Sequence, residues 1–152
     1  MQVTVRQAAA TDAAELARLR WRWAVEERGY PGTDWPRFAE SFSAWVAESL
    51  STHLPFLAEL DGQVVGMAWL MVADRVPSAA RRHRCFGDVQ SVYVVPELRD
   101  SGVGAALLDA VLAEARRLDL EHVTVHSSDW AVRFYRRAGF QHDECWLRWL
   151  PD

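Results

Sequence analysis

The stretch VPELRDSGVGAALL, residues 95–108, contains the residue types that bind a phosphate group. An apolar run stops at Pro96, passes Arg99, Gly102 and Gly104, and continues directly into an Ala/Leu-rich helical pattern. The first turn of a helix leaves about four backbone N–H groups unpaired and carries roughly half a positive charge. Glycines there let an anion approach the backbone and an arginine adds a cation, so the pattern predicts a pyrophosphate site. The alternative is that the glycines only end a loop and allow close packing of a helix on a strand.

Other patterns of chemistry-bearing residues argue against nucleotide motifs and metal sites. The G-x-G-x-x-G fingerprint would need a glycine at Leu107, and the Walker motif would need Lys-Ser/Thr at Ala105 and Ala106. His122 and His126 would lie about 13 Å apart in a strand, which is too far for one metal ion. We therefore expect no metal site.

The rest of the sequence predicts the elements that must position the glycine-containing loop. Asp34 can cap a helix, Asp61-Gly62 favours the tight turn of a hairpin, and Gly139 suits the left-handed end of a helix. With the apolar periodicity, these signals give the order β-α-α-β-β-β-α-β-α-β, a mixed α/β sheet with helices on both faces. The expected strands cover residues 2–8, 55–60, 63–73, 88–95, 121–127 and 140–150, and the expected helices cover residues 11–23, 35–50, 102–118 and 128–138.

Length and composition indicate one globular domain spanning residues 1–152. The formal net charge of −4 provides no basic excess for binding nucleic acid. No run approaches the roughly 20 apolar residues that cross a bilayer, and the N-terminal residues lack the pattern of a secretory signal. We therefore expect a cytoplasmic protein without a membrane partner. The two cysteines form no C-x-x-C pair, which argues against a disulfide framework and a thiolate zinc site.

Two motifs resemble those of one protein family. SVYVVPELRDSGVGAALL, residues 91–108, resembles the central motif of the Gcn5-related N-acetyltransferase (GNAT) superfamily: a strand ending near proline, then Arg/Gln-x-x-Gly-x-Gly/Ala, then a helix. SDWAVRFYRRAGF, residues 128–140, resembles the second motif of that family, with Tyr135 and Gly139-Phe140 at the expected spacing. With the element order, the resemblance covers nearly the whole chain. It implies a mostly antiparallel sheet that is splayed at a cofactor cleft.

The resemblance implies binding of acetyl-CoA as the co-substrate. Pantetheine carries two amides, which the unpaired N–H and C=O groups of a splayed strand can match. Two departures from the family pattern concern Asp100, where many members have glycine, and Ser128, which is shorter than the frequent asparagine. The implied contacts to the CoA pyrophosphate come from the backbone of Arg99, Asp100, Ser101, Gly102, Val103 and Gly104, and those to pantetheine come from Val92, Val94 and Ser128.

The resemblance also assigns catalytic roles. Tyr135 would protonate the CoA thiolate as it leaves, although an aromatic packing role is the alternative. A free primary amine has a pKa near 10.4, so a base would help to generate the nucleophile. The family often has a glutamate on the central strand, which is missing here. Asp88 and Gln90 share a strand face and could act through an ordered water, or Asp88 could simply be solvated.

The sequence thus favours an N-acetyltransferase that moves an acetyl group directly to a primary amine of a small molecule or peptide. The competing hypothesis is a domain that binds acyl-CoA without transferring it, as a sensor or interaction module. The basic cluster RRHR, residues 81–84, is either solvated surface or borders the acceptor site or the 3′-phosphate of CoA. Trp146 and Trp149 on the expected last strand are candidates for a homodimer surface.

Overall fold

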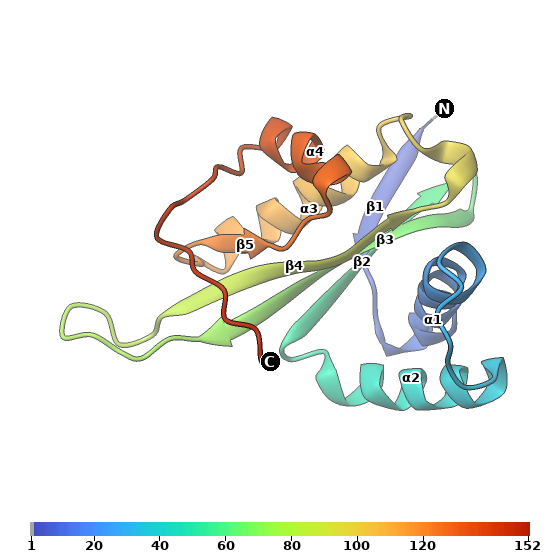
Figure 1. Ribbon diagram of the computed structural model, residues 1–152, viewed down its shortest axis with the longest axis horizontal. Coiled ribbons are helices and arrows are strands. Elements are labelled where there is room, and N and C mark those ends of the chain that lie inside the picture. The colour runs from blue at the N-terminus through green and yellow to red at the C-terminus, as the bar shows by residue number, and fades with distance from the viewer. Residues whose placement is uncertain (1) are drawn as a thin grey trace.

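The computed structural model describes residues 2–152 and contains a five-stranded sheet between two layers of helices (Figure 1). The strands follow one another in chain order; β4 and β5 are parallel, and all other neighbours are antiparallel. The expected mixed α/β fold is confirmed. The strands are β1 (Val3–Gln7), β2 (His53–Leu60), β3 (Gln63–Asp74), β4 (Cys85–Val94) and β5 (Val123–Val125), and the helices are α1 (Ala13–Trp21), α2 (Trp35–Ser49), α3 (Val103–Arg117) and α4 (Val132–Arg137).

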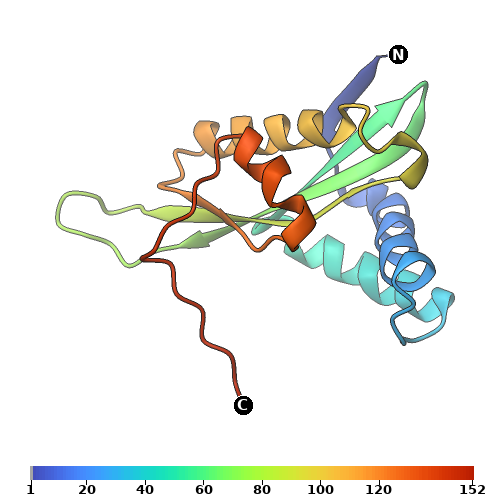
Figure 2. The same cartoon turned by 45° about the horizontal axis from the view of Figure 1, so that its top comes forward.

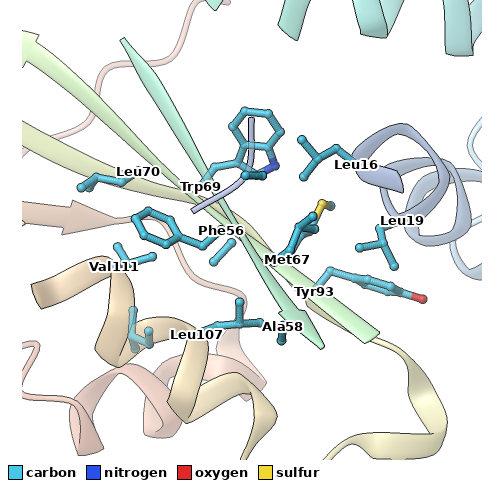
Figure 3. Packing of buried hydrophobic residues seen from close by; sticks show 14 of the residues in the cluster. Leu16, Leu19, Phe56, Ala58, Met67, Trp69, Leu70, Tyr93, Leu107 and Val111 are labelled. Atoms are coloured by element: carbon cyan, nitrogen blue, oxygen red, sulfur yellow. The ribbon is translucent and has the colours of Figure 1, made fainter. Parts of the chain in front are cut away.

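The core lies on both sides of the sheet. Helices α1 and α2 cover one face, and α3 and α4 cover the other (Figures 1 and 2). Leu16 and Leu19 of α1 pack on the first face, whereas Leu107 and Val111 of α3 pack on the second (Figure 3). All four side chains are fully buried. None of the helices within residues 2–152 is long and apolar enough to cross a bilayer.

Local sequence signals account for the main boundaries. The Asp34 carboxylate accepts a hydrogen bond from the backbone N–H of Arg37 at 2.9 Å and so caps α2, as expected. Asp61 (φ 50°) and Gly62 (φ 77°) form the tight turn between β2 and β3. Gly139 (φ 102°) ends α4 in the left-handed conformation, also as expected. These signals act within a few residues, which is why they are readable from the sequence.

An ion pair holds the start of α1 to β1. The Arg6 guanidinium donates two hydrogen bonds of 2.8 Å to Asp12 and lowers the pKa of that carboxyl from 3.8 to about 2. A carboxyl whose pKa is lowered on folding stabilises the protein above the unfolded pKa, and this stabilisation is lost as the pH falls toward the folded pKa. Asp12→Asn should therefore reduce the free energy of unfolding by about 1 kcal/mol at pH 7. Urea unfolding should show the difference shrinking between pH 4 and pH 2; an equal difference at pH 7 and pH 2 would contradict this assignment.

The strand expected over residues 140–150 is not formed. The segment leaves the body of the protein as an extended chain (Figure 2). It touches the β5 region through the Trp146 ring, 4.7 Å from that of His122, and through Arg148, 3.2 Å from the His126 ring nitrogen. The physical reason is that β5 has three residues instead of the seven expected, so its edge offers few ladder bonds. Four large apolar side chains stay exposed: Trp146 (56%), Leu147 (91%), Trp149 (83%) and Leu150 (62%).

Candidate functional site

Near its middle, strand β4 forms a bulge against β3, and its pairing with β5 ends. Its register with β3 shifts between the pairs Trp69↔Gln90 and Met67↔Tyr93, and Ser91 adopts a φ of +53° at this bulge. Its pairing with β5 ends at Val89. From Gln90 to Val94, β4 therefore has no strand partner on the β5 side among residues 2–152. The family resemblance predicts the cofactor cleft at this open edge.

Val92 and Val94, two of the three residues expected to contact pantetheine, lie on this open edge. Val92 lies at the bulge, outside the β3–β4 register. The backbone N–H of Val95 donates to Val65 at 2.9 Å, so the alternation of an antiparallel pair turns the N–H and C=O of Val94 away from β3. The Val94 carbonyl accepts a hydrogen bond from Arg99 Nε at 3.1 Å. The edge thus offers free backbone groups, but one acceptor is already occupied by the side chain of Arg99.

The loop before α3 presents a row of unpaired backbone N–H groups. Those of residues 100–105 donate no hydrogen bond to any group within residues 2–152, whereas that of Arg99 donates to Pro96 at 3.3 Å. Positive φ values at Asp100 (62°) and Gly102 (92°) shape the loop, and α3 begins at Val103. Unpaired N–H groups at the start of a long helix suit an anion.

The two glycines of this loop do different things. A Cβ atom on Gly104 would lie 3.3 Å from the Phe134 ring and 3.8 Å from Val94, so this glycine allows α3 to pack closely on α4 and β4. A Cβ atom on Gly102 would meet nothing within 4 Å. The packing interpretation of the sequence thus applies to Gly104. Gly102 borders open space.

Tyr135 packs between aromatic neighbours on α4. Its ring centroid lies 5.0 Å from that of Phe134 and 5.6 Å from that of Phe140. Burial raises the pKa of the Tyr135 hydroxyl, so the group stays protonated at neutral pH. The hydroxyl makes no hydrogen bond with any group within residues 2–152. Ser128 begins the turn that precedes α4, and its side chain caps no backbone N–H there.

Asp88 and Gln90 share a strand face, as the spacing predicts. Gln90 Nε2 donates to Asp88 at 3.1 Å, and the Thr124 hydroxyl donates to the same carboxylate at 2.6 Å. Gln90 pairs with Trp69, whose ring packs against Trp45 of α2 at 5.5 Å, so this face is the one that α1 and α2 cover. Tyr135 belongs to α4, which covers the opposite face of the sheet. Asp88 and Tyr135 therefore lie on opposite sides of the open edge, without a contact between them.

A polar cluster beside the site was not anticipated from the sequence. The Glu27 carboxylate accepts hydrogen bonds from the Tyr93 hydroxyl and, at 2.6 Å, from Arg99 Nη2. Burial and the adjacent carboxylate raise the pKa of Tyr93 above its usual range. Burial would raise the pKa of Glu27, but these two hydrogen bonds lower it overall. Glu27 lies 66 and 72 positions from its partners, so no local pattern could reveal the contact.

Arg81 and Arg84 of the basic cluster in the β3–β4 loop form ion pairs with carboxylates. Arg84 donates two hydrogen bonds to Glu121 at 2.7 and 3.0 Å, and Arg81 pairs with Asp119. Hydrogen bonds from Arg84 and Arg75 lower the pKa of Glu121 to about 2. These arginines fasten the loop to the connection between α3 and β5. Within residues 2–152, no three His, Cys, Asp or Glu side chains gather as metal ligands.

A family model and several relatives match the sequence of this chain. The model of the acetyltransferase (GNAT) family matches residues 14–140. The chain is 31% identical over 93 residues to glucosamine 6-phosphate N-acetyltransferase of Trypanosoma brucei brucei, covering 61% of both chains. It is 36% identical over 103 residues to mycothiol acetyltransferase of Thermobispora bispora, covering 64% of this chain and 31% of that one. The chain thus spans less than two thirds of the length of these relatives.

Solved structures resemble the whole chain. A predicted acetyltransferase of Clostridium acetobutylicum, solved with acetyl-CoA, superposes with a TM-score of 0.76 at 23% identity, covering 98% of this chain and 96% of that one. An aminoglycoside acetyltransferase from an uncultured soil sample, solved with sisomicin, has a TM-score of 0.76 at 16% identity, covering 99% and 95%. The fold is therefore shared at low sequence identity. Because the family model matches most of its residues, the chain belongs to the acetyltransferase (GNAT) family.

Proposed function

We propose that the protein is an acetyl-CoA-dependent N-acetyltransferase. The observation that carries the proposal is the open edge of β4 next to the loop of unpaired N–H groups at residues 100–105. An extended arm with amides can pair with the former while its diphosphate binds the latter. No other part of residues 2–152 combines an open inner strand edge with the start of a long helix.

The coenzyme contacts follow from this arrangement. The diphosphate would bind the backbone N–H groups of the loop, with Gly102 leaving room for it. The pantetheine amides would pair with the β4 edge at Val92 and Val94, and Ser128 would flank the arm from the turn before α4. The Asp100 carboxylate must point away from the diphosphate, because like charges at short range repel. The proposed diphosphate contacts are Asp100, Ser101, Gly102, Val103 and Gly104 through their N–H groups and Arg99 through its side chain.

The transfer itself would be direct. The amine attacks the thioester carbonyl, the carbonyl oxygen gains negative charge that an N–H group near Val92 stabilises, and the C–S bond breaks. Tyr135 gives its proton to the leaving thiolate. Before the attack, Asp88, held by Thr124 and Gln90, takes a proton from the acceptor ammonium through a water and so generates the neutral amine. The nitrogen loses its second proton to solvent water as the amide forms, and Tyr135 regains a proton from solvent. Approach of the amine from the α1/α2 face and of the acid from the α3/α4 face fits the opposite placement of these groups.

The acceptor we propose is a primary amine of a small molecule or peptide. The names of the relatives support a small amine, since they specify glucosamine 6-phosphate, mycothiol and aminoglycosides. The aromatic side chains of α2 and β3, including Trp45 and Trp69, line the face on which Asp88 lies. A cytoplasmic location would supply both substrates.

Calorimetry with acetyl-CoA, followed by thiol release in the presence of a panel of amines, tests this function. Binding with thiol release supports the transferase. Binding without release from any amine would favour the alternative, a sensor that holds acyl-CoA, and absence of binding would refute both. Acetyl-CoA with no amine is the control for simple hydrolysis.

We also propose that the exposed C-terminal segment contacts a second copy of the chain. The large apolar side chains of this segment, Trp146, Leu147, Trp149 and Leu150, are exposed. Because every copy carries the same segment, two copies can cover these side chains reciprocally. Light scattering should give the mass of a dimer, and Leu147→Ser with Trp149→Ser should give a monomer. A monomeric wild type would contradict the proposal.

A further inference from the structure

The Glu27 cluster, formed by Glu27, Tyr93 and Arg99, connects the acceptor side of the protein to the coenzyme loop. Glu27 ends a π-helical turn, Arg22–Glu27, that continues α1 toward α2. Tyr93 belongs to β4 and is 3% exposed, and Arg99 opens the loop before α3. Three segments that are distant in the sequence thus meet at one carboxylate.

The side chain of Arg99 lies across the open edge of β4. Its Nε atom donates to the Val94 carbonyl at 3.1 Å, and its Nη2 atom donates to Glu27 at 2.6 Å. Its guanidinium carbon lies 5.7 Å from the centre of the Tyr93 ring, a distance at which a cation is attracted to an aromatic ring. Two of the three nitrogen atoms of this guanidinium, Nε and Nη2, are therefore engaged at the place where a coenzyme arm would pair with the strand.

The ion pair between Glu27 and Arg99 competes electrostatically with the binding of a diphosphate to Arg99. A carboxylate at 2.6 Å offsets much of the charge of the Arg99 guanidinium, and it adds a negative charge close to the anion-binding loop. The Glu27 side chain is 25% exposed and that of Arg99 is 45% exposed, so the pair is accessible to a competing anion. A bound diphosphate and Glu27 would compete for hydrogen bonds from the same guanidinium, that of Arg99.

We infer that Glu27 is a positioning residue: it holds Arg99 over the open edge of β4, and acetyl-CoA binds by taking Arg99 away from Glu27. This inference rests on the proposed function, because it concerns the same coenzyme site. The inference predicts a change in coenzyme affinity that is opposite in direction to the loss expected from structural damage. Weakening the hold of Glu27 should tighten coenzyme binding.

Glu27→Gln tests the inference, because it removes the charge while the amide oxygen can still accept from Arg99 and the amide NH2 can donate to the Tyr93 hydroxyl. Calorimetry should give a Kd for acetyl-CoA that is about threefold to fivefold lower than in the wild type, in the range expected for an exposed ion pair. Glu15→Gln is the matched control. It removes the same charge from an acidic residue of α1 that pairs with Arg18 at 2.9 Å, and it should leave the Kd unchanged.

A double-mutant cycle separates the role of Glu27 from general electrostatics. In an Arg99→Ala background, Glu27→Gln should change the Kd by less than about twofold, because the guanidinium that it releases is gone. In steady-state kinetics, Glu27→Gln should lower the KM for acetyl-CoA without raising kcat. A thermal melt of each variant shows whether it is folded, and tighter binding by a less stable variant would still support the inference.

The outcomes distinguish the two proposals. If the wild type binds acetyl-CoA and Glu27→Gln binds it equally or more weakly, the inference about Glu27 is wrong and the proposed function stands. If the gain in affinity persists fully in the Arg99→Ala background, Glu27 acts by bulk charge and the inference is also wrong. If the wild type binds no acetyl-CoA, the proposed function and the inference fail together.

Discussion

Tyr135→Phe should lower kcat by about a hundredfold while leaving the Kd for acetyl-CoA within twofold of the wild type. Proton transfer by a positioned acid typically contributes a factor of 10² to 10⁴ to the rate. Phenylalanine keeps the ring contacts with Phe134 and Phe140, so α4 should keep its place. Because burial raises the pKa of Tyr135, the wild-type hydroxyl should remain a proton donor at neutral and mildly alkaline pH. The measurement is the pH dependence of kcat, by thiol release with a saturating amine.

Tyr30→Phe is the matched control for this experiment. Tyr30 is 49% exposed, and its ring packs on Trp23, away from α4. Removal of its hydroxyl should leave kcat unchanged. If Tyr135→Phe also turned over at the wild-type rate, Tyr135 would be a packing residue and the leaving thiolate would take its proton from water.

Features set by neighbouring residues could be predicted from the sequence. The cap by Asp34, the Asp61-Gly62 turn and the left-handed Gly139 all depend on the backbone within a few positions. The loop of residues 99–104 belongs to the same class, because the helix that creates its unpaired N–H groups starts at Val103. The unpaired N–H groups of this loop could therefore be predicted before the fold was known. The periodicity of the apolar residues then predicted the sheet and the helices on its two faces.

Features that depend on distant partners could not be predicted. Alternation alone suggested a strand over residues 140–150, but a strand also needs an edge of sufficient length, and β5 offers only Val123–Val125. The Glu27 cluster depends on contacts across 66 and 72 positions. Nothing in the local sequence distinguishes Glu27 from its solvated neighbour Glu26. Arg99 was expected to point to the diphosphate, yet its side chain is held by partners that only the fold supplies.

Gly102→Ala should weaken acetyl-CoA binding by about tenfold, and the control Gly62→Ala should not. Both glycines have positive φ values, 92° and 77°, and neither would place a Cβ atom within 4 Å of another residue. Alanine in this conformation costs about 1 to 2 kcal/mol at either position, so the two variants should lose similar stability. Only the methyl group at Gly102 would stand at the loop of unpaired N–H groups, where it would keep a diphosphate from its hydrogen bonds. Calorimetry of both variants measures the effect, and equal Kd values would mean that the diphosphate does not bind at this loop.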